Sequence, residues 1–146
     1  MGTRSATYQA FDSAAAASED RAMETYALAR FWAAAAWADD ELYPAERAVL
    51  QRYIEAATDL TPSQRAAAET FLTARPGVSF DEVEALSRTA KEGLYQAVIR
   101  MVMVDGKVTD DELRFVTRLR DQLELDAATI ARLEDEVRAA QSAKAE

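Results

Sequence analysis

VDGKVTDDEL, residues 104–113, joins the end of one apolar stretch to the start of another and has the outline of half a calcium-binding EF-hand loop. In such a loop Asp105 would take position five and Glu112 position twelve. Positions one and three, which must also supply oxygen ligands, are Met101 and Met103. Methionine side chains do not ligate calcium, so the EF-hand interpretation fails.

The segment WADDELYPAE, residues 37–46, has the same plan and marks an internal repeat. A shift of 66 residues places Asp39 on Asp105 and Glu46 on Glu112. The same shift superposes further apolar positions: Leu28 on Leu94, Trp32 on Val98, Ala35 on Met101, Ala36 on Val102, Leu42 on Val108, Leu50 on Val116 and Tyr53 on Leu119. The chain therefore contains two copies of one unit rather than a long solenoid.

The repeat and the composition together predict the fold. Each copy, about residues 23–72 and 89–138, has apolar positions at helical spacing for three helices, and a short helix connects the copies. Gly and Pro are scarce, with four and three residues, which favours helices throughout. We expect an all-α, compact seven-helix bundle with an internal pseudo-two-fold axis. It would form one domain, residues 18–140, between a lead-in segment at 1–17 and a frayed tail at 141–146.

Helix-start signals give provisional boundaries. Pro44 suits the first position of a helix, and Thr61 and Thr109 each begin a capping box, in which an acid or amide three residues later reaches back to the cap. Ser18 is expected to begin the first long helix, and Thr89 to begin the fifth.

Composition excludes several function classes. The chain has no Cys and no His, which removes disulfides, thiolate or imidazole metal sites and His-based catalysis. The formal net charge of −9 disfavours nucleic acid and anionic membranes, and no apolar run is long enough to span a bilayer. We expect a cytoplasmic protein with a protein partner, contacted through an exposed apolar patch or the aromatic residues Tyr8 and Phe11 of the lead-in.

The paired motifs ADDELYPAER and VDGKVTDDEL resemble those of the TerB-like (tellurite-resistance TerB) domain, over about residues 20–138. The resemblance implies a seven-helix bundle associated with bacterial tellurite resistance and related stress systems. It also implies a metal site made by the acidic motif residues, which in this sequence are Asp39, Glu46, Asp105 and Glu112.

The residues themselves leave two interpretations of these acids. They stand at the ends of apolar stripes, where carboxylates brought together must protonate, pair with cations or hold a metal. With only oxygen ligands on offer, Ca²⁺ is the first choice, and Mg²⁺ or Mn²⁺ the alternative. The structural interpretation is that Glu112 completes a capping box with Thr109, and that the aspartates brace their turns or pair with Arg47 or Arg114.

Three functions follow from these interpretations. The first is a non-enzymatic TerB-like stress module that binds a divalent cation and a protein. The second is a pure helical interaction scaffold in which the acids only cap helices. The third, a metal-dependent hydrolase, is disfavoured because the sequence contains no His, no Gly-rich phosphate loop and no nucleophile motif.

The two motifs differ at one turn position. Asp40 stands where the second copy has Gly106, and Asp adopts the left-handed backbone conformation less readily than Gly.

Overall fold

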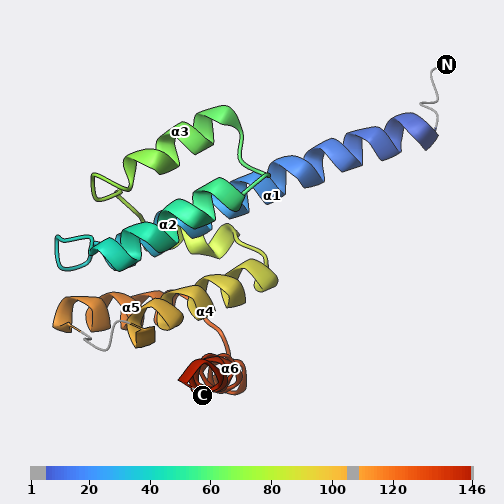
Figure 1. The fold of residues 1–146 in the computed structure, drawn as a ribbon. Helices are drawn as coiled ribbons and strands as arrows, with labels where there is room; N and C mark the ends of the chain where they lie inside the picture. Colours follow the sequence, from blue (N-terminus) through green and yellow to red (C-terminus); the bar gives the residue numbers. More distant parts are fainter. Residues whose placement is uncertain (1–5, 105–108, 146) are drawn as a thin grey trace.

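The computed structural model describes the backbone of residues 6–104 and 109–145, and side chains from 18 to 103 and 109 to 143. The described residues form six α-helices and one 3-10 helix, with no strand among them, which confirms the predicted all-α class (Figure 1). The helices, in chain order, are α1 (Ala6–Ala36), α2 (Pro44–Ala56), α3 (Pro62–Thr70), η1 (Phe80–Ala85), α4 (Arg88–Val104), α5 (Asp110–Leu123) and α6 (Ala127–Ala145).

The packing of the helices follows the sequence repeat. In the first copy α1 packs on α2 and α3, and in the second copy α4 packs on α5 and α6. The leading helices α1 and α4 also pack on each other, and η1 lies against α5. Figure 1 shows α1 and α4 running toward the same end of the bundle, where α2 and α5 begin. The fold thus brings the ends of both leading helices to one side of the molecule.

Apolar residues predicted to share one stripe do form the core. Leu94 and Val98 of α4 are fully buried, and Phe31 and Trp32 of α1 are buried beside them. The α1 aromatics are therefore core residues rather than part of a cofactor site. Among the described residues, no helix is long and apolar enough to cross a bilayer.

Two predicted helix starts are wrong. The long first helix begins at Ala6 rather than at Ser18, and it runs through that serine without interruption. The alanine-rich run around Ser18 has high helix propensity, which outweighs the tendency of a single serine to cap. The fifth predicted helix starts at Arg88, because the hydroxyl of Ser87 accepts the backbone N–H of Ala90 at 3.1 Å and caps it two residues before Thr89.

Other local signals are confirmed. Thr61 accepts the Gln64 backbone N–H at 3.1 Å while the Gln64 side chain accepts the Thr61 N–H at 3.0 Å, a complete capping box. Pro44 occupies the first turn of α2. The last helix continues to Ala145, through most of the segment predicted to fray. That residues 1–17 form a unit apart from the domain stays a prediction.

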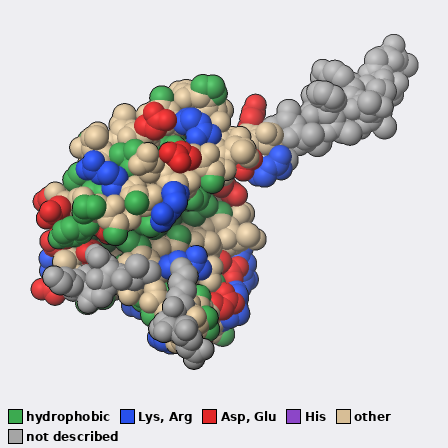
Figure 2. Space-filling model, in the orientation of Figure 1, with side chains coloured by type: hydrophobic (Ala, Val, Ile, Leu, Met, Phe, Trp, Pro, Cys, Tyr) green, Lys and Arg blue, Asp and Glu red, His purple; other side chains and the backbone are tan. Residues whose placement is uncertain are grey.

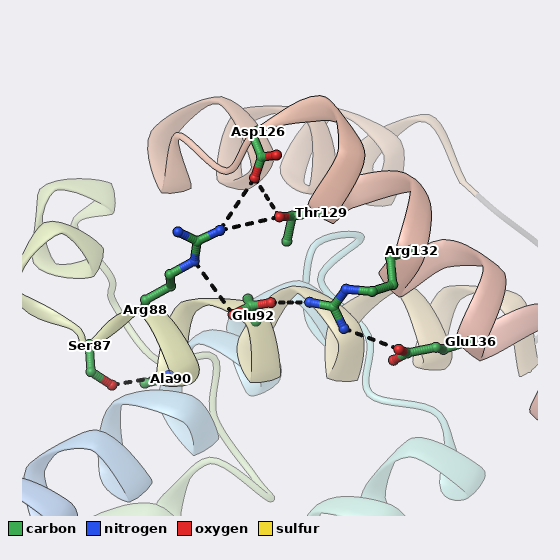
Figure 3. A network of polar contacts seen from close by, with 8 residues as sticks. All are labelled: Ser87, Arg88, Ala90, Glu92, Asp126, Thr129, Arg132 and Glu136. Atoms are coloured by element: carbon green, nitrogen blue, oxygen red, sulfur yellow. Dashed lines mark hydrogen bonds and ion pairs between the residues drawn. The ribbon is translucent and has the colours of Figure 1, made fainter.

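The docking of α6 on α4 is polar at its rim (Figure 3). Arg132 of α6 pairs with Glu92 of α4 and, at 3.1 Å, with Glu136 of its own helix. Arg88 pairs with Asp126 at 3.5 Å, and Asp126 also accepts the hydroxyl of Thr129. That hydroxyl is the main cause that lowers the pKa of Asp126, with Arg88 adding to it.

Candidate functional site

The first motif turn joins α1 to α2 in a tight reversal. Residues 37–43 leave the end of α1, and Asp40 has a positive φ of 65°. The predicted left-handed Asp is therefore present, at the position that Gly106 takes in the second copy. An ion pair from Arg75 to Asp40 at 2.8 Å ties this turn to the segment after α3.

Tyr43 connects the two acids of the first copy. It is the residue before α2, in extended conformation, and its backbone N–H donates to Glu46 Oε1 at 3.1 Å. Its hydroxyl donates to Asp39 Oδ2 at 3.2 Å. Asp39 and Glu46 thus flank one tyrosine, with Glu46 only 4% exposed. The Glu46 side chain makes the acid half of a capping box, whereas the Tyr43 side chain makes no cap hydrogen bond to the helix.

The two contacts of Tyr43 change its chemistry. The hydrogen bond to Asp39, together with the negative charge of that carboxylate, raises the pKa of Tyr43 to about 12. The phenol therefore stays protonated at neutral pH and donates to Asp39. The other oxygen of Asp39 is buried and accepts no hydrogen bond from the described part of the chain.

The second motif is described from Thr109 onward. The Thr109 hydroxyl accepts the Glu112 backbone N–H at 3.1 Å, so the predicted cap at the start of α5 is confirmed. Glu112 is 1% exposed and lies on the buried face of α5. Asp105 and Gly106, and with them the predicted second aspartate ligand, lie outside the described residues.

The three described site residues lie at one end of the bundle but do not form one cluster. Figure 1 shows α2 and α5 starting at the same end of the molecule. Within residues 18–103 and 109–143, no three acidic side chains lie close enough together to form a metal site, so Asp39, Glu46 and Glu112 are not gathered into one. The convergence expected for the three described acids is not seen. In the first copy Asp39 and Glu46 both contact Tyr43, whereas in the second copy only Glu112 of the predicted pair is described.

The arginine partner predicted for Asp39 is not the partner observed. Asp39 is held by Tyr43 rather than by Arg47, and Arg114 pairs with Asp111. Tyr43 is the functional residue that sequence analysis missed. Its position four residues after Asp39 and three before Glu46 was the available signal, because those spacings bring side chains together at a helix start.

Comparison with known proteins agrees with this architecture. The family model described as "Tellurite resistance protein TerB" matches residues 25–135, which contain both motifs and nearly the whole bundle. Comparisons with curated proteins and with solved structures gave no match.

Proposed function

The chain belongs to the tellurite resistance protein TerB family, and from this premise we propose that it is a stress-response module that binds a divalent cation and a protein partner. TerB is a family of helical, non-enzymatic domains. The proposal extends this to the chain itself, which would act in the cytoplasm by binding rather than by catalysis.

The burial of two equivalent glutamates carries the cation proposal. Glu46 and Glu112 occupy the same position of the repeat and are 4% and 1% exposed. A capping box does not require burial, since Gln64 plays the same role in α3 while partly exposed. Keeping two carboxylates out of water is costly unless hydrogen bonds, protons or cations offset their charge. A buried acid at the same place in both copies supports a shared role for the two glutamates, and cation binding is the role that we propose.

Asp39 adds a ligand whose geometry fits a cation. One of its oxygens accepts the Tyr43 hydroxyl, and the other is buried without a hydrogen bond from the described residues. A buried carboxylate oxygen with free lone pairs is suited to a metal ion. In the first copy Asp39 and Glu46 would hold the ion, and in the second Asp105 and Glu112.

The ligand chemistry favours a hard cation. All four proposed ligands are carboxylates, and no Cys or His is available anywhere in the chain. Oxygen ligands on a turn suit Ca²⁺, which accepts variable geometry, and next Mg²⁺ or Mn²⁺. Two carboxylates per ion leave room for water and backbone carbonyls, so we expect weak, exchangeable binding.

Isothermal calorimetry and thermal unfolding of chelator-treated protein with Ca²⁺, Mg²⁺ and Mn²⁺ test the proposal. A cation that binds only the folded state stabilises it by about 2.7 kcal/mol at a hundredfold excess over Kd. Asp39→Asn and Glu46→Gln should each abolish the first-copy response. Asp110→Asn is the matched control, because Asp110 is an exposed acid at the start of α5 outside the proposed ligand set.

Heat and a melting-temperature shift that lose their first-copy part in both variants but are unchanged in the control would support cation binding. The fluorescence of Trp37, two residues before Asp39, gives a second readout. No response at millimolar metal would contradict the cation proposal and leave the scaffold function, in which the acids only cap α2 and α5. That alternative is favoured by the Tyr43–Glu46 and Thr109–Glu112 capping contacts.

A further inference from the structure

A surface hollow of about 530 Å³ lies beside the first motif turn. The end of α1, the segment after α3, η1 and α5 enclose it. Three arginines line this hollow, Arg75, Arg114 and Arg118, and Asp111 is the single acid among the described residues that line it. In a chain with net charge −9, a concave surface dominated by guanidinium groups runs against the overall charge and attracts anions locally.

The floor of the hollow is apolar and aromatic. Phe80 of η1 and Phe115 of α5 are both buried to 9% exposure, with ring centroids 5.1 Å apart. Ala34 completes this floor from α1. A ligand that filled the hollow would meet an apolar surface below and cations around it, which is unlike a site built for an inorganic ion alone.

The arginines differ in how far their charge is already matched. Arg75 pairs with Asp40 at 2.8 Å, and Arg114 pairs with Asp111. Arg118 has no acidic partner in the described part of the chain, and its guanidinium lies 4.3 Å from the centre of the Phe80 ring. A guanidinium held over an aromatic face does not use its N–H donors on the ring. Arg118 is therefore the arginine best placed to donate hydrogen bonds to a carboxylate.

The wall of the hollow is fixed rather than loose. Arg30 of α1 donates from Nε to the Gly77 carbonyl at 2.7 Å and from its terminal nitrogen to Glu82 at 2.8 Å. These contacts hold the segment between α3 and η1 against α1, with Pro76 buried beneath it. A preformed wall lowers the entropic cost of binding.

We propose that this hollow is the docking site for an acidic peptide segment of the protein partner, with an apolar side chain as its anchor. The anchor packs on Phe80 and Phe115, and a flanking carboxylate pairs with Arg118. Further carboxylates compete with Asp40 and Asp111 for the remaining arginines. The inference rests on the part of the proposed function that assigns a protein partner, and it is independent of the cation.

Fluorescence anisotropy with a fluorescein-labelled EEFEE peptide, at low salt and with chelator present, tests the site. We expect saturable binding that weakens as salt screens the charges. The peptide EEAEE, which lacks the anchor, should bind at least several-fold more weakly, and KKFKK should not bind. Chelator keeps the result separate from the cation test, so failure here leaves cation binding untouched.

Arg118→Gln should weaken EEFEE binding about tenfold or more, because a desolvated carboxylate would lose its charged partner. Arg118→Lys keeps the charge but loses the guanidinium that lies over Phe80, and we expect an intermediate loss of affinity. The matched control is Arg138→Gln, an exposed arginine of α6 that pairs with Asp135 at 2.8 Å, outside the hollow. Both positions are exposed, and thermal unfolding checks that each variant is folded.

Equal binding by the Arg118→Gln and Arg138→Gln variants would overturn the proposal, as would equal affinity for EEFEE and EEAEE. Inorganic phosphate serves as the competitor. Full displacement of the peptide by low millimolar phosphate would show a general anion site and overturn the assignment to a peptide, whereas persistence of the peptide would support it.

Discussion

In the first repeat aromatic contacts join α3 to α1, whereas in the second ion pairs form the rim of the contact between α6 and α4, around the buried Leu133 and Val137. Tyr26 stacks near Phe71 with ring centroids 5.9 Å apart, and the Trp37 indole donates to the Phe71 carbonyl at 2.8 Å. The repeat places Tyr26 at the position of Glu92, which pairs with Arg132 (Figure 3). The third helix of each repeat therefore packs on its leading helix with different side-chain chemistry.

The second helices of the two repeats differ more strongly. Val49 and Tyr53 of α2 are 42% and 39% exposed, while their equivalents in α5, Phe115 and Leu119, are 9% and 0% exposed. The difference arises from η1, which packs on α5 and places Phe80 against Phe115. Helix α2 packs on α1 and α3, but the described part of the chain has no second 3-10 helix like η1. Figure 2 shows charged and apolar side chains interspersed over the face of the molecule drawn there.

Two equivalent positions keep both their residue type and their burial in the two repeats. Glu46 and Glu112 are both buried, although the apolar faces that follow them are not equally covered. Neither the aromatic docking of α3 nor the ionic docking of α6 requires an acid at these places. Their agreement between the two copies points to a role at the end of the bundle where α2 and α5 begin.

The largest expected effect comes from matched truncations on the two second helices. Leu119→Ala should lower the free energy of unfolding by about 3 kcal/mol, because the side chain is fully buried and a cavity remains. Tyr53→Ala should cost about 1 kcal/mol, since Tyr53 is half exposed and mainly loses its 3.3 Å hydrogen bond to the Thr25 carbonyl. Urea unfolding measures both.

Equal losses of unfolding free energy in Leu119→Ala and Tyr53→Ala would contradict the difference in burial between α5 and α2. They would mean that the α2 face is covered in solution by a segment such as the lead-in or by a second copy of the chain. Repeating the measurement on a chain that lacks residues 1–17 distinguishes these two cases, because only the first loses its cover.

A smaller effect separates the two helix starts. Thr109→Ala should destabilise the domain by about 1 kcal/mol, because its hydroxyl caps α5, whereas Thr109→Ser should be nearly neutral. In the first copy the equivalent residue, Tyr43, provides no side-chain cap. Thermal unfolding compares the variants, and a loss in the serine variant as large as that in the alanine variant would show that the methyl group, not the cap, matters.

The smallest effect appears only at alkaline pH. Because Asp39 raises the pKa of Tyr43 to about 12, the folded state favours the neutral phenol, so this contribution to stability is present below about pH 10 and is lost as pH rises toward 12. Carbon-13 NMR of labelled tyrosine rings should show Tyr43 still protonated at pH 11. In Asp39→Asn its pKa should fall toward the usual value.

Tyr53 and Tyr95 provide internal controls for this titration. Burial is the main cause that raises the pKa of each, so neither should respond to Asp39→Asn. A Tyr43 resonance unchanged by the substitution would mean that the Asp39 contact is not formed in solution. A Tyr43 pKa lowered by added Ca²⁺ would place the cation on Asp39.

Local signals predicted some helix starts and missed others for a physical reason. Thr61 and Thr109 cap as expected, since each hydroxyl accepts the backbone N–H three residues later, and at Thr61 the Gln64 side chain completes the box. Ser18 does not begin a helix, since the alanines before it favour helix as strongly as the residues after it. Ser87 caps α4 two residues before the predicted start, and capping potential alone did not decide between adjacent hydroxyls.

The sequence by itself determined the helical class, the two-copy organisation and the positions of the paired acids. The helical class follows from the local periodicity and helix propensity of the sequence. The two copies and their acids follow from an internal repeat with a constant shift of 66 residues. Only the tertiary structure decided that Phe115 is buried while its equivalent Val49 is exposed, that Tyr43 joins Asp39 to Glu46, and that three arginines line one hollow. Burial and electrostatic environment depend on segments distant in sequence, and equal positions in a repeat acquire unequal neighbours when the connecting segments differ.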